Sequence, residues 1–477
     1  MRAHKATRGL RHGLRLAPFL LFFLAYAWVH LKYWDGSKPT APATRVPSVA
    51  AAASGLHCTS AYPQRPWTTT STRRPALELG PGCAGVALRE ALLPQPPARA
   101  RAEPPTPPLR VLFVLARALY DGMTDAYLME QLEACDRHPG MNCSVWGPGF
   151  VGFNGAQTLE ENIAARHGAA GHYHIHFFQP GEPHVLLAPE PPLGVKRAQR
   201  FNEDWNSYNS ALWQRLRIDI VMFSFAQDMF ESAVRFAGAG LYDGSVFVHA
   251  PMAADPLLFD AGDDVAENKS SAGILAGAKD PYCYPMRTRL AGMVQRGALP
   301  GTVRAHPGYI MPTPELRHRQ RLNFSAALRA AKLSYVTSSH YRYRLQKFSE
   351  VALSRTLLVG TLPQEREELF RDIMVELRED DTDAYIATIV RWWLEHGEER
   401  RAVARLAQLV ARRLFTWDAV FAERLYGAHA RLVRGEAGWW FAEPFTVRTP
   451  RRNVCDCNPR ARASEYVLGA RCPHVPA

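Results

Sequence analysis

The sequence predicts an α/β protein in which two doubly wound, Rossmann-like domains follow an N-terminal transmembrane helix and a disordered stem. Three observations predict this organisation. Continuous apolar runs alternate with helical patterns from Leu109 onward, which is typical of parallel sheets covered on both faces. The alternation breaks in a polar stretch after Ala250 and then resumes. The chain of 477 residues also exceeds what one hydrophobic core usually supports.

The N-terminus indicates entry into the secretory pathway. Residues 1–15 contain five Lys or Arg and no acid, and an apolar run from Leu16 to Leu31 follows. This pattern predicts a cytosolic tail over 1–15 and a signal-anchor helix over 16–34, because basic flanks stay on the cytosolic side. A signal peptide cleaved near Ala41–Ala43 is the alternative. We expect a single-pass type II protein of the Golgi or endoplasmic reticulum membrane, with its globular part in the lumen.

The rest of the chain divides by composition. Residues 35–108 are rich in Pro, Ala, Ser, Thr and Arg and show little apolar periodicity, which predicts a stem that holds the globular part off the membrane. We expect a first domain over 109–254, a second domain over 255–434 and a C-terminal tail over 435–477.

The first domain begins with a strand–helix–strand unit. The apolar run "LRVLFVLA" predicts a buried strand from Leu109, Thr124 can cap the helix "DAYLMEQLEAC", and "NCSVW" predicts the second strand. Three later runs continue the sheet: "HYHIHFF" from His172, "IDIVMFS" from Ile218 and "SVFVHA" from Ser245.

The second domain repeats this alternation. Its first strand is "AGILAGA", Ala272 to Ala278, and the basic helix "MRTRLAGMVQRG" follows. The strand "LSYVTSS", the helix "LQKFSEVALSR" and the strand "TLLVG" form the next unit, and the chain is helical from Pro363 to Arg434.

The net charge, the cysteines and the sequons indicate which partners and modifications the chain can have. The net charge of +12 suits nucleic acid, an anionic membrane or a phosphate-bearing small molecule. A lumenal protein rarely meets nucleic acid, so we expect no nucleic-acid partner and interpret the basic tail as solvated surface. The eight cysteines suit structural disulfides in an oxidising lumen, with the pairing open. Sequons at Asn142, Asn268 and Asn323 predict glycosylation.

Histidines alternate at His172, His174 and His176, so a strand would point all three to one side. Three imidazoles can bind a metal. The favoured interpretation is a polar strand face near a cleft that binds a ligand of the first domain, and we expect no metal.

Two loops of the second domain suit an anionic ligand, because ligands of open parallel sheets bind beyond the carboxyl ends of the strands. One loop contains Gly277, which lets a phosphate approach the backbone, and precedes a helix with Arg287 and Arg289. The other leads to Lys347, a partner for a diphosphate, and Glu350, an acceptor for a ribose diol. The alternatives are a solvated helix face for the arginines and an exposed i,i+3 ion pair for Lys347 and Glu350.

The run "YPMRTRL", then "KLSYVTSSHYRYRLQKFSEVALSRTLLVGTLP", then a pair of helices with tryptophans resembles the spore-maturation CgeB-type glycosyltransferases, which are family 1-like GT-B enzymes. The likeness covers about Asp255 to Leu432. It implies a nucleotide-sugar donor held by the second domain, a glycan, protein or lipid acceptor on the first, and transfer without a metal or other cofactor. The terminal helix from Asp418 to Leu432 resembles the segment that crosses back to the first domain in this fold.

In many retaining relatives a Glu-x7-Glu motif holds the donor, and Glu350 matches its second glutamate. Arg342 stands at the position of the first. This departure leaves the stereochemistry open and favours a rival hypothesis, a non-catalytic lumenal protein that keeps the scaffold for glycan binding. A lumenal sulfotransferase would need a phosphate-binding loop after the first strand, and "LARALYDGMTD" offers little of that.

An inverting enzyme also needs a base near the acceptor hydroxyl. Asp121, in the loop after the first strand, and His249, at the end of "SVFVHA", are the candidates. A turn-forming aspartate and a hydrogen-bonded core histidine are the structural alternatives.

Overall fold

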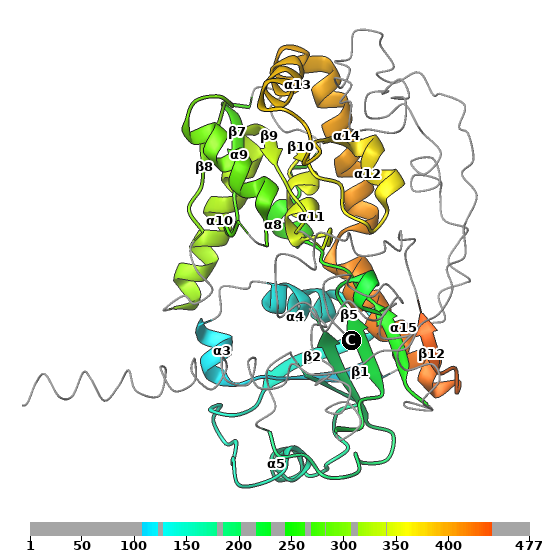
Figure 1. The fold of residues 1–477 in the computed structure, drawn as a ribbon. Coiled ribbons are helices and arrows are strands. Elements are labelled where there is room, and N and C mark those ends of the chain that lie inside the picture. Colours follow the sequence, from blue (N-terminus) through cyan, green and yellow to red (C-terminus); the bar gives the residue numbers. More distant parts are fainter. Residues whose placement is uncertain are drawn as a thin grey trace, which may run out of the picture.

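The computed structural model describes residues 107–122, 127–178, 185–201, 216–229, 244–262, 269–281, 283–306, 313–339 and 341–440. The predicted transmembrane helix, the stem and most of the predicted tail lie outside these ranges. The described residues form two α/β domains, each built on a parallel sheet (Figure 1). This confirms the predicted two-domain α/β class. Within the described ranges, no helix combines the length and apolarity that crossing a bilayer requires.

The first domain contains a parallel sheet of seven strands in the order β12-β6-β5-β4-β3-β1-β2. The apolar runs of the sequence form most of its strands, because Val, Ile and Phe pack on both faces of a buried sheet. The strands are β1 (Leu109–Val114), β2 (Met141–Trp146), β3 (Ile175–Phe178), β4 (Lys196–Phe201), β5 (Ile220–Phe223), β6 (Val246–His249) and β12 (Gly438–Trp440).

Helices cover both faces of this sheet, which gives the domain two separate cores. One face packs against α4, η1 and α15, and the other against α5. Thr158 and Glu161 form a capping box that begins α5. A disulfide between Cys135 and Cys143 joins α4 to β2. The helices are α3 (Arg117–Gly122), α4 (Tyr127–Arg137), α5 (Leu159–His167), η1 (Asp418–Ala422) and α15 (Glu423–Val433).

Strand β4 lies at the centre of the sheet although its sequence is "KRAQRF". Arg197 and Arg200 are fully buried there. Arg197 donates to the Glu160 carboxylate at 2.6 Å, and Arg200 lies over the ring of Trp417 at 4.8 Å from its centroid. These contacts offset the cost of burying two charges in the middle of a sheet.

The second domain contains a parallel sheet of five strands in the order β11-β10-β9-β7-β8. Gly360 ends β10 with a φ of +156°, and a Cβ there would lie 1.7 Å from the carbonyl oxygen of Val336, so the position requires glycine. The strands are β7 (Ser271–Leu275), β8 (Thr302–Val303), β9 (Ala331–Tyr335), β10 (Leu357–Gly360) and β11 (Met374–Glu376).

Two cores again fill the two faces of the sheet. One face packs mainly against α8, α11, α12 and α14, and the other against α9 and α13. The helices are α8 (Pro256–Phe259), α9 (Pro285–Gln295), α10 (Pro314–Ala330), α11 (Gln346–Leu353), α12 (Glu367–Ile373), α13 (Asp383–Glu395) and α14 (Gly397–Leu414).

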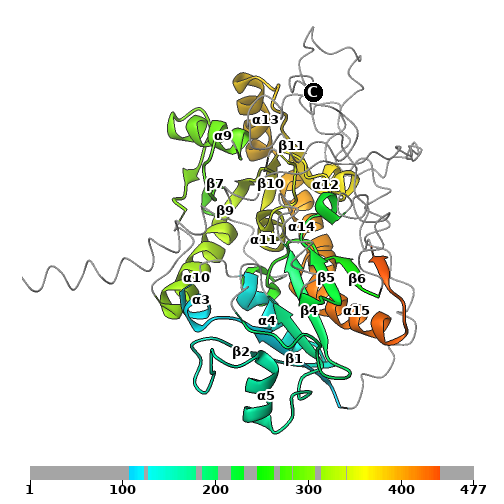
Figure 2. The same cartoon turned by 60° about the horizontal axis from the view of Figure 1, so that its bottom comes forward.

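The chain passes between the domains twice, and the two passages are adjacent. Ala254 donates its N–H to the carbonyl of Phe415 at 3.0 Å, and Trp417 donates its N–H to the carbonyl of Ala254 at 3.1 Å. After the second passage, η1 and α15 pack on the first sheet, and β12 pairs with β6, beside α15 in Figure 2. The predicted return of the terminal helix to the first domain is confirmed. Strand β12 lies within the range predicted as a tail, because its Trp439 and Trp440 pack against the sheet.

Candidate active site

The strand order of the second sheet reverses between β7 and β9, because the chain runs from β7 to β8 on one side and from β9 to β10 and β11 on the other. Open parallel sheets bind ligands at such a switch point, beyond the carboxyl ends of the strands. The loops after β7 and β9 are the two loops that the sequence analysis selected.

A pocket among the described residues lies at this switch point. Ala276 follows β7, Thr337 follows β9, and the side chains of Arg287 on α9 and Lys347 on α11 complete the wall. The remaining lining residues are Phe324, Ser334, Tyr335, Val336 and Val351. This small pocket therefore combines two cations with hydroxyl-bearing and apolar side chains, and a pair of cations is suited to binding a phosphate.

Arg287 forms hydrogen bonds with both loops of the pocket. Its guanidinium donates to the Thr337 hydroxyl at 3.2 Å, to the Thr337 carbonyl at 3.1 Å and to the Ala278 carbonyl at 3.0 Å. Gly277 has a φ of +117°, and a Cβ there would lie 2.8 Å from the Arg287 guanidinium. The positive φ favours glycine at this position, and the Arg287 guanidinium occupies the space beside it, where the sequence predicted the approach of a phosphate.

Lys347 and Glu350 form an ion pair at 2.7 Å that is only partly open to solvent. The Lys347 side chain is 30% exposed and the Glu350 side chain 5%. The Lys347 ammonium also lies 4.3 Å from the centroid of the Phe324 ring. Lys347 therefore lines the pocket, while Glu350 lies behind it, and neither belongs to a fully solvated surface pair.

His306, which follows β8, lies close enough to Lys347 and Arg287 to feel their charges, and it was not predicted from the sequence. Burial, followed by the charges of Lys347 and Arg287, lowers the pKa of this histidine. A histidine held near two cations favours its neutral form, so the local field is electropositive. Its position after a strand of this sheet was the available signal, but a two-residue strand is hard to recognise from sequence.

Arg289 lies on the same helix as Arg287 and binds elsewhere. Its guanidinium donates to the Asp383 carboxylate at 2.6 Å and to the Asp381 carbonyl at 2.6 Å. Of the two arginines predicted on this helix, the structure brings Arg287 to the pocket and directs Arg289 to the start of α13.

The two candidate bases lie on the first domain in different environments. Asp121 belongs to α3 and pairs with Arg117 at 2.7 Å, and its side chain is 37% exposed. The second domain comes close here, because Arg317 on α10 donates to the Tyr120 carbonyl at 2.7 Å. His249 is buried at the end of β6, where its carbonyl accepts a hydrogen bond from Arg424. Asp121 is therefore the more accessible of the two candidates.

Arg342 takes a left-handed conformation with a φ of +61°. Its guanidinium donates to the Leu362 carbonyl at 2.9 Å and 3.2 Å. The residue at the position of the first motif glutamate thus joins the loop after β9 to the loop after β10.

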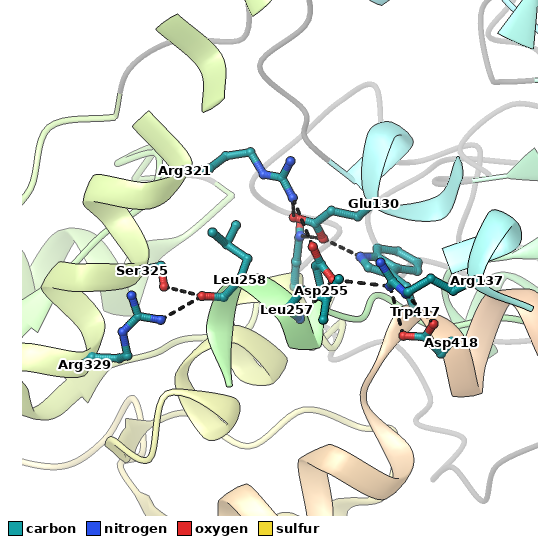
Figure 3. Close-up of polar contacts among 11 residues, drawn as sticks. Glu130, Arg137, Asp255, Leu257, Leu258, Arg321, Ser325, Arg329, Trp417 and Asp418 are labelled. Atoms are coloured by element: carbon teal, nitrogen blue, oxygen red, sulfur yellow. Dashed lines mark hydrogen bonds and ion pairs between the residues drawn. The ribbon is translucent and has the colours of Figure 1, made fainter. Parts of the chain in front are cut away.

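A second polar cluster lies between the domains and escaped the sequence analysis (Figure 3). Its centre is Glu130 on α4, which is 1% exposed. Burial raises the pKa of the Glu130 carboxyl to about 7, although the charge of Arg321 opposes the rise. Glu133, one turn on, also has its pKa raised by burial. A helical glutamate usually faces solvent, so local sequence gave no sign that Glu130 is buried.

The remaining site predictions concern the alternating histidines and the asparagines of the sequons. His172 stacks on His167, His174 accepts from the N–H of Arg110, and His176 is buried with its pKa lowered to about 3 by burial. No group of three potential metal ligands occurs among the described residues. Asn142 and Asn323 are exposed, and Asn268 lies outside the described residues.

No protein-family model and no curated protein matches this chain. Solved structures of glycosyltransferases are similar to it at low identity. Sucrose-phosphate synthase from Thermosynechococcus elongatus has a TM-score of 0.44 and 11% identity, covering 68% of this chain and 99% of that one. An alpha-glucosyltransferase in complex with UDP-glucose and DNA has a TM-score of 0.47 and 9% identity, covering 67% and 99%. HepE from Anabaena, in complex with UDP and glucose, has a TM-score of 0.40 and 11% identity, covering 68% and 99%. At these TM-scores the similarity assigns neither a family nor a reaction.

Proposed function

We propose that the protein is a GT-B glycosyltransferase that moves a sugar from a nucleotide-sugar donor to a glycan, protein or lipid acceptor. We also propose that it works in the lumen of the Golgi or endoplasmic reticulum as a type II membrane protein. The observation that carries the proposed reaction is the pocket at the switch point of the second sheet, which Arg287 and Lys347 line. The proposed location rests on the sequence of the N-terminus alone.

Glycosyl transfer leaves a nucleoside diphosphate, whose developing charge must be stabilised. Cationic side chains fixed in a partly dry pocket can do this without a metal. Arg287 is held by three hydrogen bonds, so it needs little reorganisation when the charge develops. His306 near the pocket can add a third positive charge, since a bound diphosphate would favour its protonated form.

The ion pair of Lys347 and Glu350 suggests how a donor is held. A diphosphate that takes Lys347 as its partner would release the Glu350 carboxylate from this ion pair. The released carboxylate could then accept hydrogen bonds from the hydroxyls of a ribose. On the acceptor side, Asp121 is the base in this proposal, because its side chain is more accessible than that of His249 and lies near α10 of the second domain.

A screen of nucleotide sugars for thermal stabilisation of the full-length chain tests the proposal. A donor present at a hundred times its Kd should stabilise the native state by about 2.7 kcal/mol. Lys347→Ala should weaken binding by roughly tenfold, the effect of one charge-assisted contact.

Two neighbouring arginines provide a matched control. Arg287→Lys removes the fixed guanidinium of the pocket, whereas Arg289→Lys alters a guanidinium that binds at α13. We expect the first substitution to weaken donor binding and the second to leave it unchanged. The proposal fails if no nucleotide sugar stabilises the chain, or if both variants bind as the wild type does.

The conformation of Arg342 favours a second candidate, a non-catalytic glycan-binding protein. Its guanidinium is engaged by the Leu362 carbonyl, so a basic loop contact replaces the carboxylate of the Glu-x7-Glu motif. Glycan binding without nucleotide binding would select this candidate.

A further inference from the structure

Three hydrogen-bond donors converge on the carboxylate of Glu130, and each comes from outside the helix that carries it (Figure 3). Arg321 donates to Oε1 at 2.9 Å, while Gln346 and Trp417 donate to Oε2 at 3.0 Å and 2.5 Å. The carboxylate is buried, so these donors replace the water that an exposed glutamate would bind.

The three donors belong to structural elements that determine how the domains sit on each other. Arg321 lies on α10 and Gln346 is the first residue of α11, both in the second domain. Trp417 lies at the second passage of the chain between the domains. One carboxylate of the first domain therefore contacts two helices of the second domain and the second passage of the chain between the domains.

The same cluster includes the first passage of the chain. Asp255 caps α8 through the N–H of Leu257 and lies 3.7 Å from Arg321. Arg137 on α4 bonds to Asp255 at 3.3 Å and to Asp418 at 2.9 Å. Both passages are thus attached to α4 by charged groups, and Arg321 joins the two halves of the cluster.

The contact with Gln346 lies one residue away from the pocket lining. Gln346 precedes Lys347, which lines the pocket, and Glu350 pairs with Lys347 one turn later. The leading N–H groups of a helix have no partners within the helix, so contacts from other elements help to hold its first turn. No side-chain cap begins α11, and its first turn is held by two polar side-chain contacts: Gln346 donates to Glu130, and the Ser349 hydroxyl donates to the Met252 carbonyl at 3.2 Å.

We propose that Glu130 is a positioning residue that holds the start of α11, and with it Lys347 and Glu350, in the arrangement that binds the donor. Glu130 does not line the pocket, so it acts through Gln346. This inference rests on the proposed donor site and adds a control of that site from the other domain.

Two substitutions test it with UDP-glucose as the first probe. Gln346→Ala removes the link and keeps the carboxylate, and we expect the affinity to fall by roughly two- to tenfold, the effect of one typical hydrogen bond. Glu130→Ala removes the acceptor for all three donors, and we expect a larger loss. If Glu130→Ala fails to fold, Gln346→Ala decides.

Glu160→Ala is the matched control. Glu160 is another buried carboxylate of the first domain, but its partners, the Arg197 guanidinium and the Ala188 N–H, belong to the same domain. We expect this substitution to lower stability and to leave the affinity of the folded protein within about twofold of wild type. If Glu130 had only a structural role, Glu130→Ala would likewise lower stability and leave the affinity unchanged. Wild-type affinity in both Glu130→Ala and Gln346→Ala therefore overturns the inference.

Hydrogen exchange separates this inference from the proposed function. Without any nucleotide, the amides of 346–353 should exchange faster in Glu130→Ala and Gln346→Ala than in wild type or Glu160→Ala, because α11 loses the Gln346 contact. If wild type binds no nucleotide sugar, the proposed function fails and the exchange result alone decides the positioning role. Unchanged exchange over 346–353 in both variants overturns it.

Discussion

Replacing Glu130 with glutamine should flatten the dependence of stability on pH. Burial raises the pKa of this carboxyl from its ordinary value of 4.5 to about 7. The folded protein then binds the proton more tightly than the unfolded chain does. Stability contributed by Glu130 is therefore fully present in acid and is lost as the pH rises from about 4.5 to about 7.

The size of the effect follows from the two pKa values. Each pKa unit corresponds to about 1.4 kcal/mol, and the two titration curves together give a loss of about 2.5 kcal/mol between pH 5 and pH 8. Glu130→Gln carries no ionisable group at this position. Its altered contacts with Arg321, Gln346 and Trp417 add an offset that is independent of this titration.

Urea denaturation of wild type and Glu130→Gln at pH 5 and pH 8 measures the effect. We expect the difference in unfolding free energy to shift by about 2.5 kcal/mol in favour of the variant at the higher pH. Gln346→Ala is the control, because it retains the carboxylate and should keep the wild-type slope. A difference that stays constant within about 0.5 kcal/mol would refute the reasoning, since it would mean that Glu130 titrates alike in both states.

Three further outcomes are expected. Burial lowers the pKa of Lys269 to about 7, so the folded state disfavours the charged form of this lysine. The stability of the wild type should therefore rise with pH above about 7. The urea midpoints of Lys269→Met should lack this rise. Phe421 is fully buried against the first sheet, and Phe421→Ala should cost about 3–5 kcal/mol in urea denaturation, with a cost below about 1 kcal/mol contradicting the assigned packing. Binding of UDP-glucose should raise the pKa of His306, because the diphosphate offsets the charges of the nearby cations. NMR titration of the imidazole with and without the ligand measures this pKa. An unchanged pKa would mean that the diphosphate binds elsewhere.

The strands that could be predicted from the sequence are those whose apolar residues pack on both faces of a sheet. The run "LRVLFVLA" became β1 and "TLLVG" became β10, because an uninterrupted apolar run is stable only in a buried position. Strand β4 could not be predicted in this way. Its Arg197 is tolerated at the centre of the sheet only because Glu160, 37 residues earlier, is buried beside it. That compensation depends on tertiary structure.

The candidate site, like the fold, could be predicted only in part from the sequence. Loop positions after β7 and β9 could be predicted, because the carboxyl ends of parallel strands meet at one edge. The sequence could not show which arginine of α9 turns inward, since Arg287 and Arg289 differ only in which loop each can reach. Nor could it show that Glu130 is buried, because its three donors are 191, 216 and 287 residues away in the chain.

The position of Glu130 connects the domain junction to the pocket. Two backbone hydrogen bonds join Ala254 to Phe415 and Trp417, so the two passages of the chain between the domains are held together at this point. Glu130 contacts Trp417 at this junction and Gln346 at the start of α11. Gln346 and Lys347 are consecutive residues, so the proposed donor contact at Lys347 adjoins a contact between the two domains.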